Sequence, residues 1–132
     1  MLNPASVTVL IIDDNDVSRS MLRHILVSEK YQVVGEAGSG KHGMELAERL
    51  RPRVICLDIN MPSPNGIDVL RQVRASLPQT EVLMVTGNND RESVTEAMQL
   101  GAAGYIVKPF NPSTLLRTLE QTVLKAGAPA VK

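Results

Sequence analysis

The chain has 132 residues, enough for one compact domain with its own core but hardly for two. Hydrophobic residues make up 43% of it and charged residues 21%, a globular composition that excludes a disordered or collagen-like chain. Its 14 basic residues balance 14 acidic ones, so it lacks the basic surplus with which proteins neutralise nucleic-acid phosphates.

Five short apolar runs, rich in Val and Ile, predict β-strands. Most are continuous rather than alternating, which is typical of parallel strands buried on both faces. The runs are Val7 to Ile12, Val33-Val34, Val54 to Leu57, Val82 to Val85, and Tyr105 to Val107.

The segments between and after these runs have apolar residues at helical spacing. In the first, Val17, Met21, Leu22, Ile25 and Leu26 are expected on one buried face. The others centre on Met44 to Leu50, Ile67 to Val73, Val94 to Met98, and Leu115 to Val123.

Start signals agree with this assignment of helices. Asp16, Asp90 and Asn111 are predicted to cap the first, fourth and fifth helices, and Pro112 follows Asn111 at a favoured first-turn position.

A βα unit repeated five times predicts an α/β fold. We expect a single doubly wound (βα)5 domain with a five-stranded parallel sheet, of the flavodoxin-like type, with helices on both faces. The domain would span residues 1–132, with a core of about 6–125 and a flexible tail or linker stub at 126–132.

Ligands of such folds bind outside the carboxyl ends of the strands. Asp13 and Asp14 follow the first predicted strand, Asp58 follows the third, Thr86 the fourth and Lys108 the fifth. Three acids, one hydroxyl and one amine are therefore expected to converge at one edge of the sheet.

This set of residues suits phosphoryl chemistry. Crowded carboxylates repel one another unless a cation neutralises them, and oxygen-only ligands favour Mg²⁺ or Mn²⁺. Lys108 and Thr86 would supply an ammonium and a hydroxyl donor for a phosphoryl group. Asp58 ends the central apolar run and is the natural nucleophile, which would give an aspartyl-phosphate.

Two enzyme classes are the alternatives. Residues 35–42, GEAGSGKH, approach the phosphate-binding loop of nucleotide hydrolases, and VICLD at 54–58 resembles the strand and Asp that hold Mg²⁺ there. However, His42 cannot supply the required hydroxyl, and Thr86 and Lys108 would have no role. A haloacid-dehalogenase-like phosphohydrolase would need Asp-x-Asp after the first strand, which Asp14-Asn15-Asp16 only imitates.

Five spaced motifs occur together in one order. They are Asp13-Asp14 after VTVLII, Asp58 in ICLDINMP, Met61-Pro62 followed by Gly66, Thr86 closing EVLMVTG, and Tyr105 with Lys108-Pro109 in GYIVKPF. Through these motifs the chain resembles the CheY-like receiver domain of bacterial two-component response regulators, over residues of about 6 to 125.

The resemblance implies a phosphorelay role. Asp58 would accept a phosphoryl group from a phosphohistidine on a sensor histidine kinase or a histidine phosphotransfer protein. Mg²⁺, with Mn²⁺ as a substitute, would be held by the side chains of Asp14 and Asp58 and the backbone carbonyl of Asn60. Asp13 would reach the ion through a water molecule.

The resemblance also implies a conformational switch. Lys108 would bind a phosphoryl oxygen, and the Lys108–Pro109 bond would be cis. Thr86 would move toward the phosphoryl group and Tyr105 would swing inward behind it. These shifts would reshape the surface formed by the fourth helix, fifth strand and fifth helix. Such a protein is a signalling switch that catalyses only its own phosphorylation and dephosphorylation, and is not otherwise an enzyme.

Two positions depart from the commonest receiver pattern. Arg53 stands where an acidic residue is frequent after Pro52, which is a surface change. Gly87 follows Thr86 where alanine is usual, so access to the phosphoryl site stays open while the switch loop gains freedom.

The output is open between two expectations: a stand-alone receiver that acts on a protein partner, and the receiver of a longer regulator whose output domain lies elsewhere. A phosphorylation-dependent homodimer is a further expected assembly. No helix-turn-helix or basic stripe indicates direct nucleic-acid binding. No signal peptide or long apolar run indicates a membrane, and Cys56 reads as a buried apolar residue, so a cytoplasmic protein is expected.

The nucleotide-hydrolase alternative makes a distinct prediction. We expect calorimetric titration with Mg-ATP to give no heat of binding, because position 42 lacks the hydroxyl that the phosphate-binding loop requires. Saturable ATP binding that is lost on Lys41→Ala would contradict this expectation.

Overall fold

The computed structural model of the chain describes residues 2–87 and 91–127. The strands are β1 (Thr8–Ile12), β2 (Gln32–Ala37), β3 (Val54–Asp58), β4 (Glu81–Thr86) and β5 (Gly104–Val107). The helices are α1 (Asp16–Ser28), α2 (Gly40–Leu50), α3 (Gly66–Ser76), α4 (Arg91–Gln99) and α5 (Pro112–Gly127), with a short 3-10 helix η1 (Pro4–Ser6) before β1.

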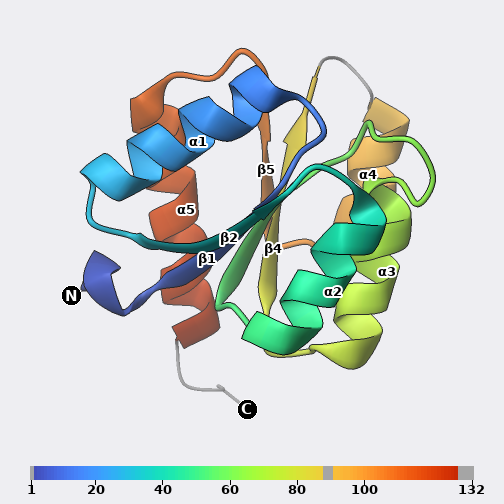
Figure 1. Cartoon of the computed structure of the whole chain (residues 1–132), viewed down its shortest axis with the longest axis horizontal. Helices are drawn as coiled ribbons and strands as arrows, with labels where there is room; N and C mark the ends of the chain where they lie inside the picture. The colour runs from blue at the N-terminus through green and yellow to red at the C-terminus, as the bar shows by residue number, and fades with distance from the viewer. Residues whose placement is uncertain (1, 88–90, 128–132) are drawn as a thin grey trace.

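The five strands form one parallel sheet, as the sequence predicts, and their order in it is β2-β1-β3-β4-β5. Helices cover both faces: α1 and α5 lie on one side, and α2, α3 and α4 on the other (Figure 1). Two hydrophobic clusters fill the spaces between these layers. The fold is therefore the doubly wound flavodoxin-like (βα)5 arrangement.

The central strands are more deeply buried than the edge strands. Every residue of β3 is buried, and only the first residues of β1 and β4 are partly exposed. β2 and β5 end the sheet, and there the expectation of strands buried on both faces is wrong. In β5 only Ile106 is buried, while Tyr105 and Val107 are exposed, because no strand lies beyond β5 in the sheet.

The start of α1 differs from the prediction. Its cap is Asn15, whose side chain accepts the backbone N–H of Ser18, and Asp16 is the first helical residue. Asn15 takes this role because its backbone is extended, as a capping residue requires. The same helix leaves Val17 68% exposed, and Met21 is also exposed, so the predicted buried face is narrower and centres on Leu22, Ile25 and Leu26.

The predicted start of the fifth helix is confirmed. The Asn111 side chain accepts the backbone N–H of Thr114 at 2.8 Å and caps α5, which begins at Pro112. α5 continues to Gly127, slightly beyond the expected core boundary, and the predicted cap Asp90 and tail residues 128–132 lie outside the described residues. None of the described helices is long and apolar enough to cross a membrane.

The connection from β3 to α3 brings a helix start against the end of the central strand. Asn65 and Asp68 form a capping box at this start, and the Ser63–Pro64 bond before it is cis. The backbone N–H of Gly66 donates to the carbonyl of Ile59 at 3.0 Å. A Cβ at position 66 would collide with the Asp58 carbonyl and lie 2.6 Å from the Ile59 Cα. Only glycine therefore fits at this position.

Gly66→Ala is expected to lower the free energy of unfolding by about 3 kcal/mol, because backbone atoms rather than flexible side chains block the added methyl. Gly104→Ala is the matched control, since the nearest atoms to its Cβ lie at 3.6 Å. We expect that control to change stability by less than about 0.5 kcal/mol. Urea unfolding of both variants measures the difference, and equal stabilities would contradict the close approach.

Candidate functional site

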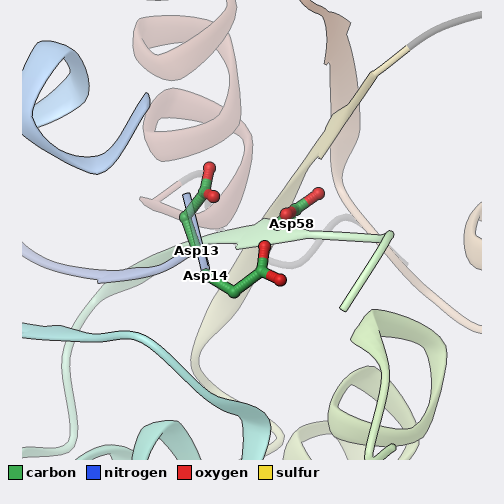
Figure 2. A group of neighbouring side chains, drawn as sticks. All are labelled: Asp13, Asp14 and Asp58. Carbon is green, nitrogen blue, oxygen red and sulfur yellow. The ribbon is translucent and has the colours of Figure 1, made fainter. Parts of the chain in front are cut away.

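Three acidic residues meet at the carboxyl edge of the sheet. Asp13 and Asp14 directly follow β1, and Asp58 is the last residue of the neighbouring strand β3. Asp13 and Asp58 are buried and Asp14 is exposed. One carboxylate oxygen from each lies within 4.8 Å of the others, and Figure 2 shows the group gathered at the ends of the two strands. The predicted convergence of the three acids is present.

Asp13 is held through its backbone and both carboxylate oxygens. Its backbone N–H donates to the carbonyl of Ala37 at 3.0 Å, which ties it to the end of β2. Its Oδ1 accepts the backbone N–H of Asn15 at 2.9 Å. Its Oδ2 lies 2.9 Å from Lys108 Nζ in an ion pair.

Asp58 lies in a less neutralised environment than Asp13. Its Oδ1 accepts the backbone N–H of Asn60 at 3.1 Å, and its Oδ2 is 3.8 Å from Lys108 Nζ. Burial, and then the charge of Asp13, raise the pKa of Asp58 from 3.8 to about 7, against the opposing effects of Lys108 and the Asn60 N–H. The negative charge on Asp58 is therefore incompletely compensated by the protein.

Lys108 comes from the far side of the site, directly after β5. Its backbone N–H donates to the Thr86 carbonyl at 2.7 Å, which fixes the end of β5 against the end of β4. The Lys108–Pro109 peptide bond is cis. The ammonium reaches both buried carboxylates, and it is the basic partner of each in this part of the described structure.

Thr86 ends β4 and is fully buried. Among the described residues its Oγ1 has no hydrogen-bond partner, which is uncommon for a buried hydroxyl. Tyr105, in β5, is 47% exposed. Gly87 follows Thr86, and among the described residues the nearest atom to a Cβ there would be Asn60 Nδ2, at 3.9 Å.

The residues present fit a small divalent cation. Carboxylate oxygens from Asp13, Asp14 and Asp58 form a hard, oxygen-only donor set, and a single ammonium opposes their charge. Asp14 is exposed, so an ion held here would keep contact with water, as Mg²⁺ usually does. The structure places the N–H of Asn60 toward Asp58, and its carbonyl stays a sequence-based candidate ligand.

One neighbouring residue escaped the sequence analysis. Arg19, in α1, donates from Nη1 to the Asp13 carbonyl at 2.8 Å and forms an ion pair with Asp16 at 2.6 Å. Its Nε also lies 3.5 Å from Glu36 in β2. The spacing from Asp16 to Arg19 signals a helical ion pair, but no local pattern signals the contacts with Asp13 and Glu36.

The glycine-rich stretch GEAGSGKH lies beside this site without forming a phosphate-binding loop. Ser39 caps α2 by accepting the backbone N–H of His42, and Lys41 is exposed on the first turn. Cys56 is fully buried in β3, and burial raises the pKa of its thiol to about 12, as expected for a packing residue.

Comparisons with known proteins agree on one family. The model of the response regulator receiver domain matches residues 9–120. The chain is 35% identical over 113 residues to the chemotaxis protein CheY of Thermotoga maritima, covering 86% of this chain and 94% of that protein. It is 37% identical over 122 residues to the nitrate/nitrite response regulator protein NarL of Escherichia coli, covering 92% of this chain but 56% of NarL.

Solved structures agree with the sequence relatives. The chemotaxis protein CheY4 of Vibrio cholerae superposes with a TM-score of 0.81 at 36% identity, covering 88% of this chain and 98% of CheY4. The response regulator domain of Thermotoga maritima CheB gives a TM-score of 0.82 at 32% identity, covering 89% of this chain and 96% of that domain.

Asp58→Asn is expected to stabilise the metal-free protein, because the buried charge on Asp58 is poorly compensated. The pKa of Asp58 is higher in the fold than in the unfolded chain, so its ionisation costs stability progressively as pH rises from about 4 to about 7. The gain in the variant should therefore be largest near pH 8 and shrink toward about pH 5. Thermal unfolding in the presence of a chelator measures this.

Mg²⁺ provides the control for the same experiment. It should raise the unfolding midpoint of the wild type near pH 8, lose this effect near about pH 5, and act less on Asp58→Asn. If the stability of Asp58→Asn relative to the wild type did not change with pH, the raised pKa of Asp58 would be contradicted.

Proposed function

The chain belongs to the response regulator receiver domain family of two-component systems, and we propose that Asp58 is its phosphoacceptor. The observation that carries the proposal is the environment of Asp58. It is a buried carboxylate at the end of a central strand, next to Asp13, within 3.8 Å of an ammonium, and with a pKa raised to about 7. Perturbed groups of this kind concentrate at functional sites.

A divalent cation is part of the proposal. Mg²⁺ would be held by Asp14 and Asp58 and by the Asn60 carbonyl, with Asp13 acting through water and Mn²⁺ as a substitute. When bound, the ion would supply positive charge to the phosphoryl oxygens and favour the ionised form of Asp58. The three carboxylates exceed the single nearby ammonium in charge, which supports a further cation at this edge.

The chemical step transfers a phosphoryl group from a phosphohistidine to Asp58. A carboxylate oxygen of Asp58 forms a bond to phosphorus, the phosphorus–nitrogen bond breaks, and the imidazole leaves with the electron pair. Lys108 lies 3.8 Å from Asp58 Oδ2 and would bind a phosphoryl oxygen, which offsets charge during the transfer. Gly87 carries no side chain beside Thr86, which would help the donor to approach.

The response to phosphorylation is proposed to use Thr86 and Tyr105. The Thr86 hydroxyl is buried without a described partner, so a phosphoryl oxygen would give it an acceptor. Movement of Thr86 would leave space for Tyr105, now 47% exposed, to turn inward. The resulting change would reach the surface of α4, β5 and α5 as a shift between two populations.

Partners follow from the same proposal. The phosphodonor would be a sensor histidine kinase or a histidine phosphotransfer protein. The output would be a protein partner, an output domain outside this chain, or a phosphorylation-dependent homodimer. Direct nucleic-acid or membrane binding by this chain is not proposed. The protein would catalyse only its own phosphorylation and dephosphorylation, in the cytoplasm.

With Mg²⁺ and acetyl phosphate, the protein is expected to gain one phosphoryl group in an acyl-phosphate linkage, and Asp58→Asn should abolish the modification. Asp68→Asn is the matched control, because it replaces a partly exposed Asp in the α3 capping box and keeps a side-chain oxygen there. Intact mass measurement detects the product. Undiminished modification of Asp58→Asn would show that another residue is the acceptor.

A further inference from the structure

Arg19 connects three parts of the chain that meet beside the acidic residues. From the second turn of α1 its guanidinium reaches back to the β1–α1 loop, where Nη1 donates to the Asp13 carbonyl at 2.8 Å. Nη2 binds Asp16 at 2.6 Å, and Nε lies 3.5 Å from Glu36 on β2. The side chain is 21% exposed, so it is mostly enclosed by these groups.

These contacts differ in how much they restrain the chain. Asp16 is 87% exposed, and an ion pair with such a residue is screened by water and contributes little. The Glu36 contact is long and partly exposed. The bond to the Asp13 carbonyl is a charge-assisted hydrogen bond to the backbone of a buried residue, and is the contact of most structural consequence.

The Asp13 backbone is thereby held from two directions. Its N–H is bound by the Ala37 carbonyl of β2, and its carbonyl is bound by Arg19 of α1. With both peptide groups fixed, the Asp13 carboxylate can place one oxygen on the Asn15 N–H and the other beside Lys108. The peptide that Arg19 binds also joins Asp13 to Asp14, so it influences both acids.

The space for the guanidinium is supplied by Gly38. A Cβ at position 38 would lie 3.3 Å from Arg19 Nη1, closer than most side chains are found, and no other atoms crowd that position as closely. The absence of a side chain at Gly38 therefore leaves room beside Arg19 Nη1, the atom that donates to the Asp13 carbonyl.

We propose that Arg19 is a positioning residue for the cation site, acting through the Asp13 carbonyl to hold Asp13 and Asp14 at the edge of the sheet. The proposal rests on the cation site of the proposed function. Arg19 would not touch the ion, and its effect would come from the backbone geometry of two carboxylates. Residues that orient ligands in this way change metal affinity by about 10- to 100-fold when they are replaced.

Arg23 offers a matched control on the same helix. Its Nε forms an ion pair with Glu36 at 3.0 Å, and among the described residues the structure shows no contact between Arg23 and the β1–α1 loop. Arg23→Ala therefore removes one positive charge and one contact with Glu36 and leaves the Asp13 carbonyl bonded. Any effect that Arg19→Ala has beyond Arg23→Ala belongs to the bond with the Asp13 carbonyl and to the ion pair with the exposed Asp16, of which only the first restrains the loop.

The test compares wild type, Arg19→Ala and Arg23→Ala in two measurements on the full chain, at a temperature where circular dichroism shows all three folded. Calorimetric titration with Mg²⁺ alone gives the dissociation constant, which we expect to rise about ten-fold in Arg19→Ala and less than about two-fold in Arg23→Ala. Hydrogen exchange of the metal-free protein follows the Asn15 amide, bonded to Asp13 Oδ1, which should exchange faster only in Arg19→Ala.

The outcomes separate the two proposals. An Arg19→Ala variant with a lowered melting temperature, but with Mg²⁺ affinity and Asn15 protection like those of Arg23→Ala, would assign Arg19 a general stabilising role and overturn the inference. A wild type that binds no Mg²⁺ would reject the cation site itself, and Asn15 exchange would still decide whether Arg19 holds the loop. Should Arg19→Ala fail to fold, Arg19→Lys carries the same comparison, with a smaller rise of about three-fold expected.

Discussion

Two carboxylates buried side by side at the edge of a parallel sheet are the constraint on which the rest of the structure depends. Asp13 follows β1 and Asp58 ends the neighbouring β3, and among the described residues one ammonium, that of Lys108, faces both. Burial removes the water that would otherwise stabilise two negative charges so close together. Lys108 Nζ lies 2.9 Å from Asp13 and 3.8 Å from Asp58, and burial together with the charge of Asp13 raises the pKa of Asp58. A proton or a cation would neutralise the remaining negative charge of the site. An isolated, solvated carboxylate has no such uncompensated charge.

Such a cluster would relax if the backbone around it could move, and the fold prevents that movement. β1 and β3 lie in the middle of the sheet, with hydrophobic clusters on both faces, so their ends cannot separate without disrupting the core. The start of α3 presses against the end of β3 so closely that only Gly66 fits. The Asp13 backbone is bound by β2 on one side and by Arg19 on the other. The two buried carboxylates are thus kept close together by packing contacts that lie mostly outside the site itself.

The sequence predicted those parts of the site that follow from topology and failed where a choice depended on local geometry. Parallel strands bring their carboxyl ends to one edge of the sheet. Asp13, Asp58 and Lys108 each lie at such an end, so the sequence alone predicted that they meet. Asn15 and Asp16 are both good capping residues, and only the extended backbone at Asn15 distinguishes them. Helical spacing indicates a face but not its width, which is why Val17 was wrongly assigned to the core. The contact between Arg19 and Asp13 joins a helix to the loop before it. Hydrophobic periodicity gives no information about such a contact, so the sequence did not predict it.

The glycine-rich stretch GEAGSGKH shows that a local sequence pattern can also suggest a function wrongly. Its composition indicates a phosphate-binding loop, but its geometry does not support one. In a phosphate-binding loop, glycines let backbone N–H groups approach a phosphate. Here Gly38 lets a guanidinium approach, and a Cβ at Gly40 would lie 2.9 Å from Pro64 Cγ, so both glycines serve close packing. Lys41, which would bind phosphate in such a loop, is exposed on α2 instead. If Asp58 is the phosphoacceptor, Gly38 still contributes to phosphate chemistry, but indirectly, by leaving room for the Arg19 guanidinium that binds the Asp13 carbonyl.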